Sequence, residues 1–309
     1  MLIADGSNHR VSVWTRPTRG STAWAFQTTF GVFGTAVNQF QKPRGVALST
    51  DGLTAWVADE KDPRESSTMR PSQVSIWTRP DAASTAWTFQ TAFGTPGSGP
   101  GQFLDTLGIA AAPNGLTVWV ADPGNNRISV WTRPDAASTV WSNVTTFGTV
   151  GSGASQLKDP VGVAVSSDTR TAWVADNGNQ RISVWIRPDA ASTAWTNQTT
   201  FGSLGNKPDQ FTDPRGVAVS PDGLRAWIVD GGAAPLPLYG NDRVAVWSRP
   251  NTGSTSWSLV TTFGSIGSGP DEFSSPQDLA VAADGRTVYV TQNGGGDVTF
   301  VKIWDLACP

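Results

Sequence analysis

The chain has 309 residues, a formal net charge of −3 and 15% charged residues, and its 38% apolar residues are enough to build a core. This balance excludes a disordered chain, and the sequence pI of about 5.1 argues against broad nucleic-acid binding, which needs a basic surface. The single cysteine, Cys308, excludes an internal disulfide and a cysteine metal cage. No stretch approaches the ~18 consecutive apolar residues of a membrane span.

The tryptophans, 15 in all, mark an internal repeat. Trp77, Trp131 and Trp185 follow one another at intervals of 54 residues, within segments such as RISVWTRPDAASTVW and RISVWIRPDAASTAW. The same position recurs at wider spacing in Trp14, Trp247 and Trp304. We therefore divide one domain of residues 1–309 into units at about 1–39, 40–102, 103–156, 157–210, 211–272 and 273–309.

Each unit predicts four short strands, labelled a to d in chain order. In the fifth unit they cover residues 216–219, 225–230, 243–247 and 256–263, all β-branched or aromatic and bounded by turn residues. Between strands a and b, Asp-Gly or Asn-Gly predicts a primed two-residue turn with positive φ at residues 51–52, 114–115, 222–223 and 284–285. Asp168-Thr169 breaks this pattern and predicts a looser turn.

Four antiparallel strands per repeat predict an all-β fold, a β-propeller of four-stranded blades. Strands b and c are apolar on both faces, as expected for blades stacked face to face. The chain opens with a strand b and closes with a strand c, which gives 22 strands. Six blades with an incomplete first and last blade fit this count best, and five blades with spare strands are the alternative. The unpaired edge of the last strand, residues 301–304 (Val301 to Trp304), is a predicted homo-oligomer contact.

A recurring motif allows the predicted propeller to be compared with a known family. Asp122-Pro-Gly-Asn-Asn-Arg-Ile resembles the NHL signature, and related copies begin at Asp5 and Asp176. The linkers at residues 93–103 and 263–273 resemble those of the same family. The resemblance covers nearly the whole chain and implies an NHL-repeat β-propeller, most often six-bladed, without implying an activity.

The resemblance also raises two kinds of enzyme. NHL-like lyases, such as streptogramin lyase and the peptide-amidating lyase, use several histidines, and His9 is the only histidine here, so their activity does not carry over. Lactonase-like hydrolases hold a calcium ion through oxygen ligands, and they remain the alternative function. No cofactor is otherwise expected.

Most conspicuous residues recur in every unit and are interpreted as structural. The tryptophans of strands b and c are expected to pack between blades, and those of strand d are expected to be less covered. Asp at the end of strand b and Arg at the start of strand c are expected to organise the b–c turn. A second arginine set follows strand c, where charge pairing with a nearby Asp is expected. It comprises Arg16, Arg79, Arg133, Arg187 and Arg249.

Function is expected where the units differ. The b–c loop is longer in two units, at residues 60–73 and 231–241, and Arg44 and Arg215 occupy the same variable position in those two units. We expect these features to rim one channel mouth that binds a small anionic or amphipathic ligand or a protein segment. The predicted contact residues are Arg44, Arg215, Arg64, Arg70, Tyr239 and Leu238.

The sequence therefore predicts a non-catalytic binding or interaction propeller with no nucleic-acid partner and no membrane span. A self-associating structural surface protein is a further alternative. The composition suits an extracellular or cell-surface bacterial protein but does not fix the compartment.

Overall fold

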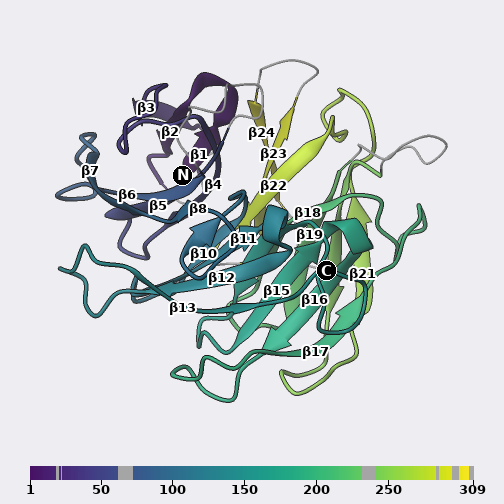
Figure 1. Cartoon of the computed structure of the whole chain (residues 1–309). Helices are drawn as coiled ribbons and strands as arrows, with labels where there is room; N and C mark the ends of the chain where they lie inside the picture. The colour runs from purple at the N-terminus through teal and green to yellow at the C-terminus, as the bar shows by residue number, and fades with distance from the viewer. Residues whose placement is uncertain are drawn as a thin grey trace. The chain divides into compact units, whose positions relative to one another are not determined.

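The computed structural model describes residues 1–18, 21, 23–61, 72–231, 241–282, 285–293 and 299–305. The chain forms two compact units, one of residues 1–125 and 129–146, the other of residues 126–128 and 147–309. Each unit consists of small antiparallel sheets, the blades, which Figure 1 labels strand by strand.

The first unit holds the first three blades. Their strands are β1 (Leu2–Asp5), β2 (Arg10–Thr15) and β3 (Ala25–Phe30); β4 (Lys42–Leu48), β5 (Thr54–Glu60), β6 (Gln73–Thr78) and β7 (Thr88–Phe93); and β10 (Ile109–Ala111), β11 (Thr117–Asp122), β12 (Arg127–Thr132) and β13 (Ser142–Phe147). Two short strands, β8 (Thr95–Pro96) and β9 (Gln102–Phe103), pair in parallel within a linker.

The second unit holds the last three blades, green to yellow in Figure 1. Their strands are β14 (Pro160–Val165), β15 (Thr171–Asp176), β16 (Arg181–Ile186) and β17 (Thr196–Phe201); β18 (Pro214–Val219), β19 (Arg225–Asp230), β20 (Arg243–Ser248) and β21 (Ser258–Phe263); and β22 (Pro276–Val281), β23 (Thr287–Asn293) and β24 (Thr299–Asp305). In three b–c turns a one-turn 3-10 helix follows strand b, at Gly6–Asn8, Pro123–Asn125 and Asn177–Asn179.

These sheets confirm the predicted fold, a six-bladed β-propeller. The blades contain 22 strands in the described part of the chain, and the first and last blades have three strands instead of four. The order within each complete blade is a-b-c-d, every neighbouring pair being adjacent in sequence.

The core lies between the faces of neighbouring blades. Strand b is buried on both faces, and its tryptophan is fully enclosed in four blades. These residues are Trp56, Trp119, Trp173 and Trp227. In the second unit, Trp173 of one blade packs with Ala226, Ile228 and Trp247 of the next. Face-to-face stacking therefore explains why strands b and c carry no polar face.

The innermost strands of neighbouring blades approach closely because of glycine. β14, β18 and β22 lie side by side in the second unit. A Cβ on Gly162 would lie 2.2 Å from the carbonyl oxygen of Arg215, and one on Gly45 would lie 2.2 Å from that of Leu107. Only glycine tolerates this backbone distance, so strand a of one blade carries glycine where the next blade passes.

Two local predictions are wrong. In the described Asp-Gly and Asn-Gly pairs, only the second residue has a positive φ, at Gly52, Gly115 and Gly223. A type I′ turn needs positive φ at both residues, and a type II′ turn needs it at the first. The turn is a longer loop in which Ser49 N–H bonds to Thr54 O and Gly52 N–H to Ser49 O. Thr169 has a φ of 61°, and its N–H makes the matching bond to Ser166 O. This turn is therefore not looser than the others.

Strand d of the fifth blade also begins later than predicted, at Ser258 instead of residue 256. The c–d pairing shifts register between Val246 and Trp247, and the same shift occurs between Val184 and Trp185 in the preceding blade. This β-bulge is an irregularity of the c–d pairing that alternation in the sequence does not reveal.

Candidate functional site

The recurring Asp of strand b organises the backbone that enters its own blade. Asp59 accepts from the N–H groups of Gln41 and Lys42, at 3.1 and 2.7 Å. Asp176 accepts from Lys158 N–H at 2.8 Å. These carboxylates are buried, at 1% and 0% exposure of the residue, and are satisfied by the loop before strand a.

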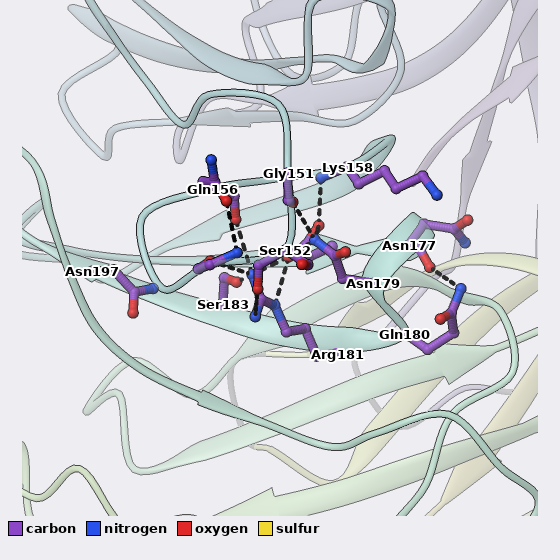
Figure 2. A network of polar contacts seen from close by, with 12 residues as sticks. Gly151, Ser152, Gln156, Lys158, Asn177, Asn179, Gln180, Arg181, Ser183 and Asn197 are labelled. Atoms are coloured by element: carbon purple, nitrogen blue, oxygen red, sulfur yellow. Dashed lines mark hydrogen bonds and ion pairs between the residues drawn. The ribbon is translucent and has the colours of Figure 1, made fainter.

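The NHL-like Asn and Arg complete this arrangement, shown for the fourth blade in Figure 2. Arg181 donates from Nε to Asp176 at 2.7 Å and from Nη2 to the carbonyls of Gly153 and Gln156, at 2.8 and 2.9 Å. Asn179 donates to Asp176 and to Gly151 O. The network ties the b–c turn to the linker that follows the preceding blade, which supports the structural interpretation of the motif.

The residue between Asn and Arg adopts a left-handed backbone in each described copy, at His9, Asn126, Gln180 and Asp242. His9 is half-buried, packs against Phe33 at 4.5 Å and contacts the carbonyl of Gln41. His9 therefore occupies a turn.

The arginines after strand c stack on the strand d tryptophan, a contact that the sequence analysis did not predict. Arg187 lies over the ring of Trp195 at 5.1 Å and donates to Thr169 O at 2.7 Å. Asp189 accepts from the N–H groups of Ala191 and Ser192, closing the turn. The same stacking recurs for Arg16, Arg79, Arg133 and Arg249 at 5.1–5.3 Å from the strand d ring. The cation–π contact therefore acts together with the charges of Asp135 and Asp189, which also act on Arg133 and Arg187.

The strand d tryptophans are therefore covered on one face by an arginine. Trp141 and Trp257 are buried, at 8% and 9% exposure, and Trp24, Trp87 and Trp195 are half-buried. They form part of the blade packing and not an open aromatic platform.

Arg44 lies at the base of the long b–c loop of the second blade. Its Nε donates to Glu60, the last residue of β5, at 2.7 Å, and Lys42 lies 3.7 Å from the same carboxylate. The Arg44 side chain is 36% exposed, and its Nη groups bond to no residue in the described part of the chain. Burial, followed by the charges of Glu60 and Asp122, raises the pKa of nearby Asp105.

Arg215 occupies the matching place in the fifth blade. Its Nε donates to Asp213 at 2.8 Å, and its Nη1 donates to Gln277 of the next blade at 2.6 Å. A Cβ on Gly231, where the long loop begins, would lie 3.2 Å from the Arg215 side chain. The side chain is 26% exposed, so it is more enclosed than Arg44.

A buried carboxylate lies near Arg215. Asp242 is 3% exposed and bonds through Oδ2 to Ser275 N–H at 3.4 Å. Burial, followed by the charges of Asp230 and Asp213, raises the pKa of Asp242, and Arg215 opposes that change.

Arg44 and Arg215 thus each lie at the base of a long loop, and each has a carboxylate partner that the sequence analysis did not name. The two arginines belong to different compact units. The other predicted contact residues, Arg64, Arg70, Leu238 and Tyr239, lie outside the described residues.

Asp278 is a residue that sequence reasoning did not single out. It stands on β22 where the other blades carry a glycine, such as Gly216. The residue is exposed, but its carboxylate lies against β18, because a Cβ on Gly216 would lie 2.5 Å from Asp278 Oδ1. Burial of the carboxyl raises the pKa of Asp278 to about 6. The broken glycine pattern was the available signal.

No group of three or more His, Cys, Asp or Glu side chains that could hold a metal ion occurs among the described residues. The described residues therefore contain no such group of ligands for the calcium ion of a lactonase-like hydrolase. In the same part of the chain, no helix has the length and apolar character needed to cross a membrane.

Comparisons with known proteins agree with this fold. The family model described as NHL repeat matches residues 157–185, which contain the Asp176, Asn179 and Arg181 network. No curated protein matches the sequence.

Solved structures of propellers match over almost the entire chain at low identity. A putative 6-phosphogluconolactonase from Bacteroides uniformis is 12% identical, with a TM-score of 0.56, over 98% of this chain and 81% of its own. A periplasmic gluconolactonase from Pseudomonas aeruginosa is 15% identical, with a TM-score of 0.55, over 96% and 81%. A chain from a nidogen–laminin complex is 13% identical, with a TM-score of 0.57, over 99% and 88%. At such low identity, these similarities support a shared fold and nothing beyond it. The chain is therefore a six-bladed β-propeller that carries an NHL repeat at residues 157–185.

Proposed function

We propose that the chain is a non-catalytic binding propeller in which Arg44 and Arg215 are each a separate contact for an anionic ligand, either a small molecule or an acidic protein segment. The observation that carries the proposal is the state of Arg44. Its Nε is fixed by Glu60, while both Nη groups are left without a bond to any described residue on a 36% exposed side chain. A guanidinium held in this way presents an oriented pair of donors to a carboxylate or phosphate.

The departure of these positions from the repeat also supports binding. The arginines of the NHL motif and those after strand c are engaged by carbonyls, carboxylates or indoles in several units, as Arg181 and Arg187 show. Arg44 and Arg215 occur instead in the two units with long b–c loops. A position that varies between otherwise similar repeats is where a repeat protein acquires a ligand.

The test measures binding of two probes, inorganic phosphate by calorimetry and a fluorescein-labelled hexaglutamate peptide by anisotropy. Arg44→Ala and Arg215→Ala are each expected to weaken binding of the preferred probe by roughly tenfold, the loss of one charge-assisted contact. Arg225→Ala is the matched control, because Arg225 is exposed at the opposite end of strand b in the blade of Arg215. Its replacement makes the same charge change and is expected to leave the affinity unchanged.

Stability separates binding from folding. Arg44→Ala is expected to change the free energy of unfolding by less than about 1 kcal/mol, since its ion pair is partly exposed. Arg215→Ala is expected to cost about 1 kcal/mol, because it also removes the bond to Gln277. If neither probe binds the wild-type protein, or if both variants bind as the control does, the proposed function is wrong.

A further inference from the structure

A repeated aromatic contact joins each blade to the next. The phenylalanine that ends strand d packs against two tryptophans of the following blade, one on strand c and one on strand d. Phe201 lies 4.9 Å from Trp247 and stacks on Trp257 at 5.0 Å and 22°. Three further phenylalanines, Phe30, Phe93 and Phe147, repeat this pair of contacts, with the strand d ring stacked at 25–27°.

The junction between the last two blades has only half of this contact. Phe263, which ends β21, lies 4.8 Å from Trp304 of β24, but the last blade has no strand d in the described residues and so no second tryptophan. Phe263 is only half-buried, whereas the four equivalent rings are 5–8% exposed. Trp304 is also half-buried, whereas Trp185 and Trp247 are 2% and 5% exposed.

The backbone at this junction is likewise unpaired. β24 pairs with β23 on one side and with no described strand on the other. In the fourth blade the equivalent edge of β16 pairs with β17, Ile182 facing Phe201 and Trp185 facing Asn197. Alignment on the tryptophans places Val301 and Trp304 at the positions of Ile182 and Trp185. An unpaired edge beside an uncovered ring is a site for strand addition.

The last blade keeps its other connections, so its edge is a formed surface. Gln292 replaces the strand b Asp and accepts from Ser274 N–H at 3.2 Å. Lys302 replaces the lost arginine by donating to Gly269 O at 2.5 Å and to Glu272 O. Both contacts hold β23 and β24 in the geometry of a complete blade.

We propose that the outer edge of β24 and the ring of Phe263 bind an extended polypeptide segment of the strand d type, antiparallel to β24. The other five blades define the chemistry of this segment, because each fills the same place with Ser-Thr-x-Trp, three variable residues and a Thr-rich end before Phe. The tryptophan of the segment stacks on Phe263, and its backbone pairs with β24. This interaction does not involve Arg44 or Arg215.

The test uses the full chain and a fluorescein-labelled peptide with the sequence of residues 192–202, STAWTNQTTFG. Saturable binding is expected by anisotropy. Replacing the peptide tryptophan by Ala is expected to weaken binding about tenfold or more, because its stacking surface is lost. In the protein, Phe263→Leu keeps an apolar side chain, removes the stacked ring and is expected to weaken binding similarly.

Phe26→Leu is the matched control, because Phe26 is a 53% exposed ring on a strand d in the other unit and should not affect the peptide. Amide hydrogen exchange locates the contact, and the peptide is expected to slow exchange in residues 301–304. The proposal fails if the peptide does not bind, if residues 301–304 gain no protection, or if Phe263→Leu behaves as the control does. A wild-type homodimer that already protects these residues without peptide would also overturn it, in favour of self-association.

Discussion

At the residue scale, the polar motif of this chain is part of its architecture. A carboxylate with no exposed surface, such as that of Asp176, is tolerated only when its oxygens are satisfied. It receives bonds from a backbone N–H, an amide, a guanidinium and a hydroxyl, from Lys158, Asn179, Arg181 and Ser183. A residue that resembles a metal or anion ligand in sequence is thus fully occupied by its own blade.

Asp176→Ala is expected to destabilise the protein by about 3–5 kcal/mol, because it removes the buried carboxylate that pairs with Arg181 and accepts from the Lys158 N–H. Asp176→Asn is expected to cost less, since Gln292 accepts the equivalent backbone bond in the last blade with an amide oxygen. Urea unfolding followed by circular dichroism measures both. Equal losses for the two variants would contradict the assigned role of the acceptor oxygen.

Asp278 gives the protein a specific pH dependence. Its folded-state pKa of about 6 lies above the ~3.9 of an unfolded Asp, so the folded state holds this proton more tightly. The contribution to stability is complete below pH ~4 and is lost as the pH rises through about 6. Asp278→Asn does not ionise, so its Tm relative to wild type is expected to increase from pH 4 to pH 7.

Asp222 is the control of opposite sign. The hydroxyl of Ser220 and the N–H of Leu224 lower the pKa of Asp222, so its contribution is present above the unfolded pKa and lost on acidification. Asp222→Asn is therefore expected to lose Tm relative to wild type as the pH rises, with most of the change below pH ~5. If the two variants shift in the same direction, the burial of the Asp278 carboxyl is not its cause.

At the element scale, the a–b turn shows how one position tolerates two residue types. Thr169 adopts φ 61° where Gly52, Gly115 and Gly223 stand in other blades. A β-branched residue is strained in the left-handed region. Its hydroxyl accepts from Arg187 Nη2 at 2.8 Å, which offsets part of that strain.

Thr169→Gly is expected to stabilise the protein by about 1 kcal/mol, because glycine removes the strain and keeps the carbonyl that Arg187 Nε contacts. Thr169→Ala is expected to destabilise it by about 1 kcal/mol, because the backbone strain remains and the hydroxyl is lost. Thermal unfolding of the two variants distinguishes these effects. A loss of stability in Thr169→Gly would show that the hydroxyl outweighs the strain.

At the scale of the whole molecule, repetition separates what builds the fold from what varies. The tryptophans and the Asp–Asn–Arg networks recur because each blade buries the same faces and closes the same turns. The departures are few: the arginines at the two long loops, Asp278 in a glycine position, and a last blade with three strands in the part of the chain that the structure describes. Both proposals for this protein rest on these departures.

The sequence by itself determined the fold class and the 22 blade strands and favoured six blades over five, because strand alternation, turn residues and a repeated tryptophan are local signals that recur in phase. It also identified the structural role of the Asp176 type of carboxylate. Only the tertiary structure decided that Arg187 stacks on Trp195. It alone showed that Arg44 and Arg215 carry carboxylate partners, and that Phe263 has no second tryptophan ring against it among the described residues. These outcomes depend on side chains that meet across blades and loops, and no local pattern encodes which of several competing contacts will form.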